Sequence, residues 1–210
     1  MHPETMPGGR SEEVFVPFPA PLSLVPQVTR FRSAWVTASI HSLRERGLFE
    51  RYQSALGEED RAALLFAPLG SWMPVGLVMT HYEACDQLGL PLGVLVSMGR
   101  EVTRRIHGGA LSLAVKMATG AGVTPWTLFG HMPRLWPRVM EGGGVGVFRL
   151  GPKEARVELV GFPLARIAYV RAATAGMLEA MTDAFCTRAW VHEVRALCTS
   201  NTLAYRVQWA

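Results

Sequence analysis

Two side chains that bind soft metal ions, His81 and Cys85, lie four residues apart in the sequence. In an α-helix this spacing places both on one face, so an imidazole nitrogen and a thiolate could bind the same ion. A zinc site needs three or four ligands, and the sequence does not identify the others. We therefore interpret the pair as a histidine packed beside a small apolar cysteine, and we predict no metal site.

His131 is the second candidate, because it lies in the apolar and aromatic segment Phe129-Gly130-His131-Met132-Pro133. An imidazole in such surroundings could bind haem iron. A single histidine among apolar residues is more commonly a core or capping residue, so haem ligation is the less favoured interpretation. Whether His131 or Cys85 does more than pack is left open.

The glycine run Gly142-Gly143-Gly144-Val145-Gly146 resembles a phosphate-binding loop only in composition. Such a loop needs a following Lys-Ser/Thr pair and a helix N-terminus, whereas a strand pattern follows here. The run is interpreted as a flexible connector into a sheet. Gly70-Ser71-Trp72 lacks the second glycine of a nucleophile elbow. No acid, base and nucleophile set converges, so we predict that the protein is not an enzyme.

Composition indicates a globular protein, with 49% hydrophobic and 18% charged residues in 210. The net charge of +4 comes from scattered arginines rather than from a basic run, so no nucleic-acid partner is predicted. Three cysteines without paired spacing indicate a reducing compartment, and we predict a cytoplasmic location. The most apolar stretch, residues 74–98, contains charged residues and a Gly-Leu-Pro break, so no membrane span is predicted.

The chain divides where its composition changes. Residues 1–27 contain six prolines and are predicted to be an N-terminal tail, although Val14 to Phe18 could dock as an edge strand or onto a partner. Residues 28–210 are predicted to form a single α+β domain. Its helical half covers residues 28–141, and its hairpin-helix-hairpin module covers residues 145–210.

In the helical half, apolar residues recur at spacings of three and four. They predict helices over residues 28–46, 58–67, 74–88, 93–107, 110–118 and 125–140. Gly108-Gly109 is expected to separate two of them. Pro133 and Pro137 are expected to kink or break the last one.

In the C-terminal module, period-two patterns predict strands over residues 145–150, 155–160, 189–197 and 203–209. A helix is predicted over residues 167–185. Helices and hairpins that are segregated along the chain favour an α+β fold. We expect the N-terminal helices and the helix at 167–185 to pack on one face of a four-stranded antiparallel sheet made of the two hairpins.

The order hairpin, helix, hairpin resembles the superfamily of haem nitric-oxide-binding domains, Bet3-type subunits of the TRAPP tethering complex and 4-vinyl-reductase-type domains. The resemblance is carried by Gly176 to Ala180, Trp190 to Val194, Cys198 and Tyr205 to Trp209. The layout also resembles a family of similarly long proteins expanded in myxobacteria, through residues 47–52 and 128–139.

Two departures limit what this resemblance implies. Many vinyl-reductase-type domains carry a second cysteine after the one that matches Cys198, and this sequence has none there. It also lacks the Tyr-x-Ser-x-Arg motif with which haem domains bind the haem propionates. Both a cysteine-based metal site and haem are therefore disfavoured. Bet3-type subunits can hold an acyl chain in an apolar channel. The resemblance implies that Cys85, on an apolar helix, could help to hold such a chain here.

The predicted function is a non-catalytic binding or sensor module that encloses an apolar small ligand between helices and sheet. The residues predicted to line the site are Trp72, Met79, Tyr82, Cys85, Met98, Trp126, Phe129 and His131. The alternative is a TRAPP-like adaptor that works as a homo- or heterodimer, through an exposed helix face or the segment from Val14 to Phe18.

Overall fold

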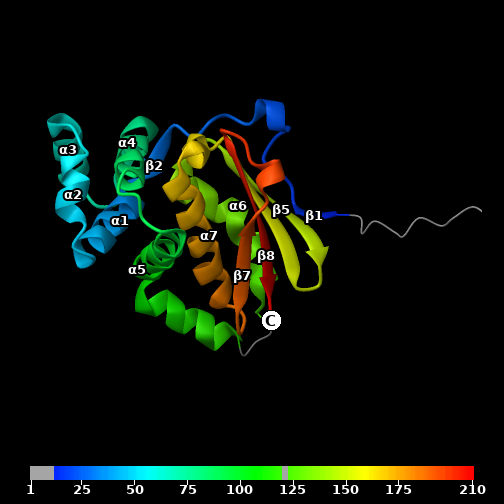
Figure 1. The fold of residues 1–210 in the computed structure, drawn as a ribbon. Helices are drawn as coiled ribbons and strands as arrows, with labels where there is room; N and C mark the ends of the chain where they lie inside the picture. The colour runs from blue at the N-terminus through cyan, green and yellow to red at the C-terminus, as the bar shows by residue number, and fades with distance from the viewer. Residues whose placement is uncertain (1–11, 120–122) are drawn as a thin grey trace, which may run out of the picture.

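The computed structural model describes residues 12–119 and 123–210, and it describes their side chains except those of residues 107–119 (Figure 1). The strands are β1 (Glu13–Val16), β2 (Arg30–Arg32), β3 (Trp72–Pro74), β4 (Met140–Glu141), β5 (Gly144–Gly151), β6 (Glu154–Val160), β7 (Ala189–Glu193) and β8 (Thr202–Trp209). The helices are α1 (Ser33–Glu45), α2 (Phe49–Ser54), α3 (Glu58–Leu65), α4 (Val75–Asp86), α5 (Leu92–Thr119), α6 (Pro125–Val139) and α7 (Ala168–Asp183).

The larger sheet has five antiparallel strands in the order β1-β5-β6-β8-β7. Both predicted hairpins are present, and β6 joins them by pairing with β8. The α+β class is confirmed, but the predicted count of four strands is wrong because β1 adds a fifth. This strand comes from the proline-rich N-terminal segment, where a docked edge strand was the alternative to a tail. Residues 1–11 lie outside the described residues, and the domain boundaries stay a prediction.

Period-two patterning explains which face of this sheet is buried. Val157, Leu203, Tyr205 and Val207 are buried and face the helices, whereas Arg206 is exposed between them. On the opposite face, arginine and glutamate side chains pair with one another, as Arg156 does with Glu158. One face is therefore dry and the other carries charge.

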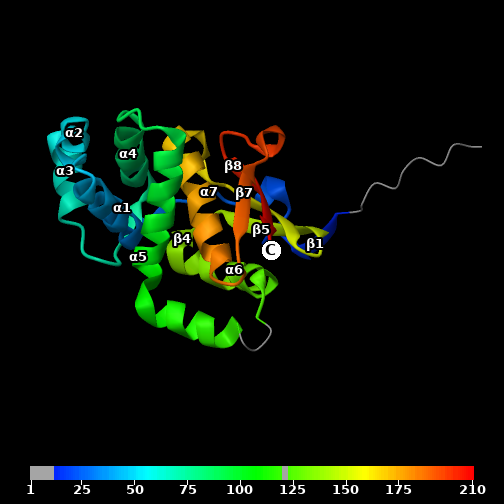
Figure 2. The same cartoon turned by 60° about the horizontal axis from the view of Figure 1, so that its bottom comes forward.

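The helices form two layers on the dry face. Helices α6 and α7 contact the sheet directly, and α1, α4 and α5 pack on α7 or on each other (Figures 1 and 2). We expected the N-terminal helices to pack on the sheet itself, and of these only α6 has an extensive contact with it. Helix α7 already covers β7 and β8, so α4 and α5 pack on α7 instead, and α1 packs on α5.

The contact between α5 and α7 is unusually close because a glycine stands on each side. A Cβ atom added at Gly99 would lie 2.0 Å from the carbonyl oxygen of Ala173, and one added at Gly176 would lie 2.0 Å from that of Val96. No other residue type permits this approach without movement of a backbone. The two helices therefore touch backbone to backbone.

Three short strands that the sequence did not predict form a second sheet, in the order β3-β2-β4. The expected helix at residue 28 instead begins at Ser33, after β2. Helix α5 runs through Gly108-Gly109, where a break was expected, although Figure 2 shows that its axis bends. Helix α6 accommodates both Pro133 and Pro137 without interruption.

Replacing Gly176 by alanine should lower the free energy of unfolding by about 2 to 3 kcal/mol, since the added methyl group meets the backbone of α5. The matched control is Gly76→Ala in α4, where a Cβ atom meets nothing within 4 Å. That substitution should be neutral or stabilising by up to about 1 kcal/mol. Urea denaturation of both variants measures the difference, and equal values would refute the close contact.

Candidate functional site

A cluster of polar and aromatic side chains is buried where α1, α2, α4, α5 and α7 meet. It contains three of the predicted site residues, Tyr82, Cys85 and Met98. The other members are Ser39, Tyr52, His81 and Tyr169, which are each at most 1% exposed. We call these seven residues the buried polar cluster.

Hydrogen bonds link six of the seven residues in two short chains. Tyr82 is partly buried and joins them through ring contacts with His81 and Tyr169. The hydroxyl oxygen of Tyr52 lies 2.8 Å from Nδ1 of His81, and Nε2 of His81 lies 3.8 Å from Sγ of Cys85. In the second chain, the hydroxyls of Ser39 and Tyr169 are 3.4 Å apart, and Tyr169 donates to Sδ of Met98 at 3.9 Å. The predicted placement of His81 and Cys85 on one helical face is therefore correct, and their further partners come from other helices.

The cluster is uncharged. Burial lowers the pKa of His81 from 6.5 to about 3, so its imidazole stays neutral at ordinary pH. Burial is also the main cause that raises the pKa of the Cys85 thiol and the pKa values of the Tyr52 and Tyr169 hydroxyls. A neutral imidazole beside a protonated thiol forms a hydrogen-bonded network rather than a nucleophile. Among the described residues, no group of three or more His, Cys, Asp or Glu could hold a metal ion.

A second cluster lies between α6 and the sheet. The ring of Trp126 packs 5.1 Å from that of Trp209 and 4.9 Å from that of Phe15, and Phe129 lies 5.7 Å from Trp209. The indole N–H of Trp126 donates to the carbonyl oxygen of Pro152 at 2.9 Å. This cluster joins α6 to both ends of the chain that the structure describes.

The remaining three predicted residues lie apart from both clusters. The guanidinium carbon of Arg32 lies over the ring of Trp72, 3.9 Å from the centre of that ring. Met79 is partly buried against the core. His131 is exposed on α6. The structure thus brings five of the eight residues into two groups and leaves three apart, and none of the eight lines either of the two hollows described below. Their role as a ligand site stays a prediction.

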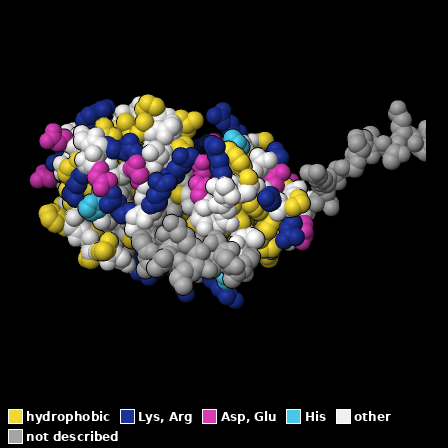
Figure 3. All heavy atoms as spheres, turned by 90° about the horizontal axis from the view of Figure 1, so that it is seen from below, with side chains coloured by type: hydrophobic (Ala, Val, Ile, Leu, Met, Phe, Trp, Pro, Cys, Tyr) yellow, Lys and Arg dark blue, Asp and Glu magenta, His cyan; other side chains and the backbone are white. Residues whose placement is uncertain are grey.

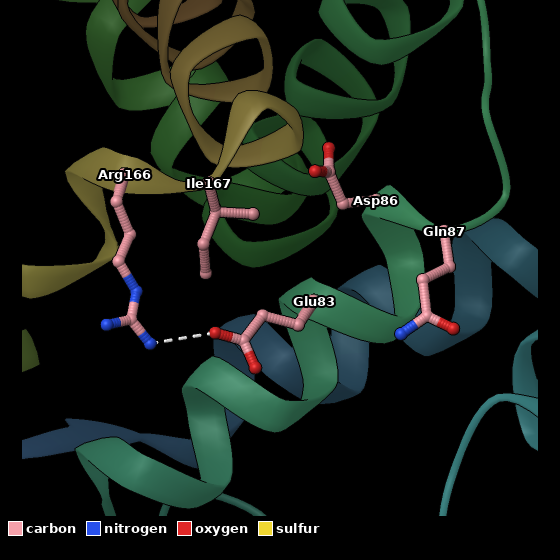
Figure 4. A pocket seen from close by; sticks show the side chains of 5 residues that line it. All are labelled: Glu83, Asp86, Gln87, Arg166 and Ile167. Atoms are coloured by element: carbon pink, nitrogen blue, oxygen red, sulfur yellow. Dashed lines mark hydrogen bonds and ion pairs between the residues drawn. The ribbon is translucent and has the colours of Figure 1, made fainter.

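The larger hollow, about 510 Å³, lies between the end of α4 and the beginning of α7 (Figure 4). Its charged side chains are already engaged with the protein. Arg166 pairs with Glu83 at 2.8 Å, and a carboxylate oxygen of Asp86 accepts the backbone N–H of Tyr169 at 2.7 Å. Asp86 therefore caps α7 from a neighbouring helix, which gives this polar hollow a structural explanation.

The smaller hollow, about 250 Å³, is apolar and partly enclosed, and we call it the apolar groove. It is lined by Pro17, Pro19, Pro133, Trp136, Pro137, Met140, Gly142, Gly143, Gly144 and Val145. One side belongs to the N-terminal strap, which we define as residues 12–19, and the other belongs to the end of α6. The indole N–H of Trp136 donates to the carbonyl oxygen of Gly142 at 2.8 Å.

The glycine run that forms part of the groove is a close-approach surface rather than a flexible connector. A Cβ atom at Gly144 would lie 2.6 Å from Cδ of Pro19, and one at Gly146 would lie 2.5 Å from the ring of Phe18. Glycines two residues apart in a strand lie on the same face, and they leave the backbone there without side chains. This spacing in the sequence indicates a face of the strand that another segment covers closely. Sequence reasoning missed it, and with it the groove.

In the part of the chain that the structure describes, every helix is too short or too polar to span a bilayer. No family model and no curated protein matches the sequence. Solved structures do match. The Fe(II) unliganded H-NOX protein from K. algicida is 7% identical with a TM-score of 0.60, over 85% of this chain and 96% of that one. A single-residue mutant of T. tengcongensis H-NOX is 14% identical with a TM-score of 0.55, over 85% and 97%.

A third similar structure, from work on haem redox potential and porphyrin distortion, has a TM-score of 0.54 at 14% identity, over 85% of this chain and 99% of that one. At such low identity the likeness establishes the fold alone. The predicted resemblance to haem nitric-oxide-binding domains is therefore confirmed for the fold. The TRAPP, vinyl-reductase and myxobacterial resemblances stay predictions.

Acidification should destabilise the protein through His81. The folded pKa of about 3 lies below the unfolded value of 6.5, so the unfolded state binds the proton first, and stability falls as the pH drops below 6.5. Between pH 7 and pH 5 this residue alone should cost about 2 kcal/mol. Urea denaturation at both pH values should show this loss in the native protein and in His131→Gln, whose site is exposed. His81→Gln should lack it, and an unchanged pH slope in that variant would contradict the assignment.

Proposed function

We propose that the protein is a non-catalytic binding module that holds a small apolar molecule in the apolar groove. The observation that carries the proposal is the lining of the groove, which consists of apolar side chains and glycine backbone. Small-molecule sites are concave and predominantly apolar. A dry cavity of about 150 Å³ accepts benzene, so a groove of about 250 Å³ suits a molecule with one or two rings or a short branched chain.

The rigidity of the wall formed by α6 supports this proposal. Pro133 and Pro137 have fixed φ angles within that helix, and the indole N–H of Trp136 is already bonded to the carbonyl oxygen of Gly142. Such a wall loses little conformational freedom when a ligand binds, which favours affinity. Trp136 contributes hydrocarbon surface to a ligand rather than a hydrogen bond.

Haem is the cofactor that the similar structures raise, and the described side chains do not fit it. The buried histidine is His81, and both of its ring nitrogens face partners within the buried polar cluster. The side chains of His41, His131 and His192 are exposed. The groove offers no imidazole, thiolate or phenolate to iron and is smaller than a porphyrin. His2 and His107 lie outside the described side chains.

The proposal also includes a reducing compartment and a small-molecule partner. The cysteines Cys85, Cys186 and Cys198 are unpaired, which supports a reducing compartment such as the cytoplasm. Basic and acidic side chains are interspersed on the face seen in Figure 3, which supports a small-molecule partner over a nucleic acid.

An adaptor is a second candidate, favoured by two apolar side chains in the loop between α3 and β3. Phe66 is 83% exposed and Leu69 is 78% exposed. A contiguous patch of exposed apolar side chains marks a protein contact, and these two side chains are candidates for one. As an adaptor, the chain should sediment as a dimer at micromolar concentration, and Phe66→Ser with Leu69→Ser should make it a monomer. Leu92→Ser, at a distant exposed leucine, is the control. A monomeric native protein would count against this candidate.

Binding in the groove can be tested with toluene as the probe. In a ¹H–¹⁵N spectrum, the indole N–H signal of Trp136 should shift with a saturable dependence on toluene, because a ring current would lie beside it. The indole N–H signal of Trp126, which is bonded to Pro152 outside the groove, should stay in place.

Met140→Phe should fill the groove and abolish saturation up to the solubility limit of toluene, whereas Met140→Leu should keep it. If Trp136 fails to respond in the native protein, or if Met140→Phe binds toluene as well as Met140→Leu does, the proposed site is wrong.

A further inference from the structure

We propose that the N-terminal strap is a detachable wall of the apolar groove, and that its ion pairs regulate the affinity for an uncharged ligand. The inference rests on the proposed function, because it concerns the same groove. It adds an electrostatic control that the lining of the groove, taken alone, does not suggest.

The strap contributes one side of the groove. Pro17 and Pro19 line it from the strap, opposite Pro133, Trp136 and Pro137 of α6. A ligand that fills the groove therefore contacts both the strap and the helix. If the strap detaches, two of the lining prolines leave and the groove becomes an open surface on α6.

The strap is held only weakly at the edge of the larger sheet. Strand β1 has only four residues, its register against β5 shifts between Val14 and Val16, and Pro17 ends the pairing. Val14 is 56% exposed. Edge elements with few buried contacts open at free energies well below that of global unfolding.

Two ion pairs whose glutamate side is exposed fasten this edge. Glu12 pairs with Arg156, and Glu13 lies 3.6 Å from Arg149. The glutamate side chains are 49% and 63% exposed, so dissolved salt screens both pairs, and it screens the first pair less because Arg156 is only 13% exposed. Apolar contacts supply the rest, with Phe15 packed on Trp126 and Phe18 packed 5.8 Å from Phe148.

Ligand and strap are then linked thermodynamically. A ligand that binds only when the strap is attached has an apparent affinity reduced by the fraction of molecules with a detached strap. By reciprocity, the ligand holds the strap in place. Salt should consequently weaken the binding of a neutral apolar ligand, although salting-out alone would leave it unchanged or strengthen it.

The test measures the Kd of toluene for the full chain from the Trp136 indole signal, at low and at high sodium chloride. Amide hydrogen exchange across β1 reports attachment of the strap in the same samples. The variant is the double substitution Glu12→Gln and Glu13→Gln. The control is Glu83→Gln, which breaks a similarly exposed ion pair with Arg166 outside the strap.

The Kd rises only by the factor by which the attached fraction falls, so this regulation requires attached and detached straps to be near balance at low salt. High salt and the double variant should then each speed exchange in β1 and raise the Kd about threefold. Glu83→Gln should change neither quantity. Faster exchange with an unchanged Kd would overturn the coupling and leave the proposed function intact. Unchanged exchange would show that the ion pairs do not hold the strap. An absence of saturable toluene binding under all conditions would overturn the proposed function and this regulation together, whatever the exchange rates.

Discussion

The backbone contact between α5 and α7 determines where the other layers lie. With Gly99 and Gly176 at the crossing, the two helix axes come closer than side chains would allow. Helix α7 therefore faces the sheet on one side and the outer helices on the other. Tyr205 anchors β8 to α7 on the side of the sheet, because its hydroxyl donates a hydrogen bond to the carbonyl oxygen of Arg171. Tyr169, on the same helix, reaches the buried polar cluster instead.

Local patterns predicted the elements that have a long, regular period. Strands β5, β6 and β8 and helix α7 follow apolar repeats of two or of three and four, and their positions agree with expectation. The strands β2, β3 and β4 have three residues or fewer, which is too short for any period to appear. They exist because distant segments meet, and such pairing is tertiary information.

The site divides in the same way. The neighbourhood of His81 and Cys85 follows from helical spacing, whereas Tyr52 and Ser39 join them from α2 and α1, which no local pattern could indicate. The apolar groove is harder still, since its residues come from positions 17–19 and 133–145. Its trace in the sequence is the alternation of glycines at positions 144 and 146. The same fold in haem proteins does not transfer their chemistry, because function depends on the side chains in the site.

The strap also covers one edge of the larger sheet. Strand β5 has eight residues, a period-two glycine face and no proline, and it would be the terminal strand of the sheet if β1 were missing. An unpaired strand of that length is a template for strand addition by another molecule. The short, bulged β1, which Pro17 ends, is a poor template by comparison. The N-terminal segment therefore acts as a built-in guard against edge-to-edge aggregation, and proteolysis beyond Val16 would remove that protection.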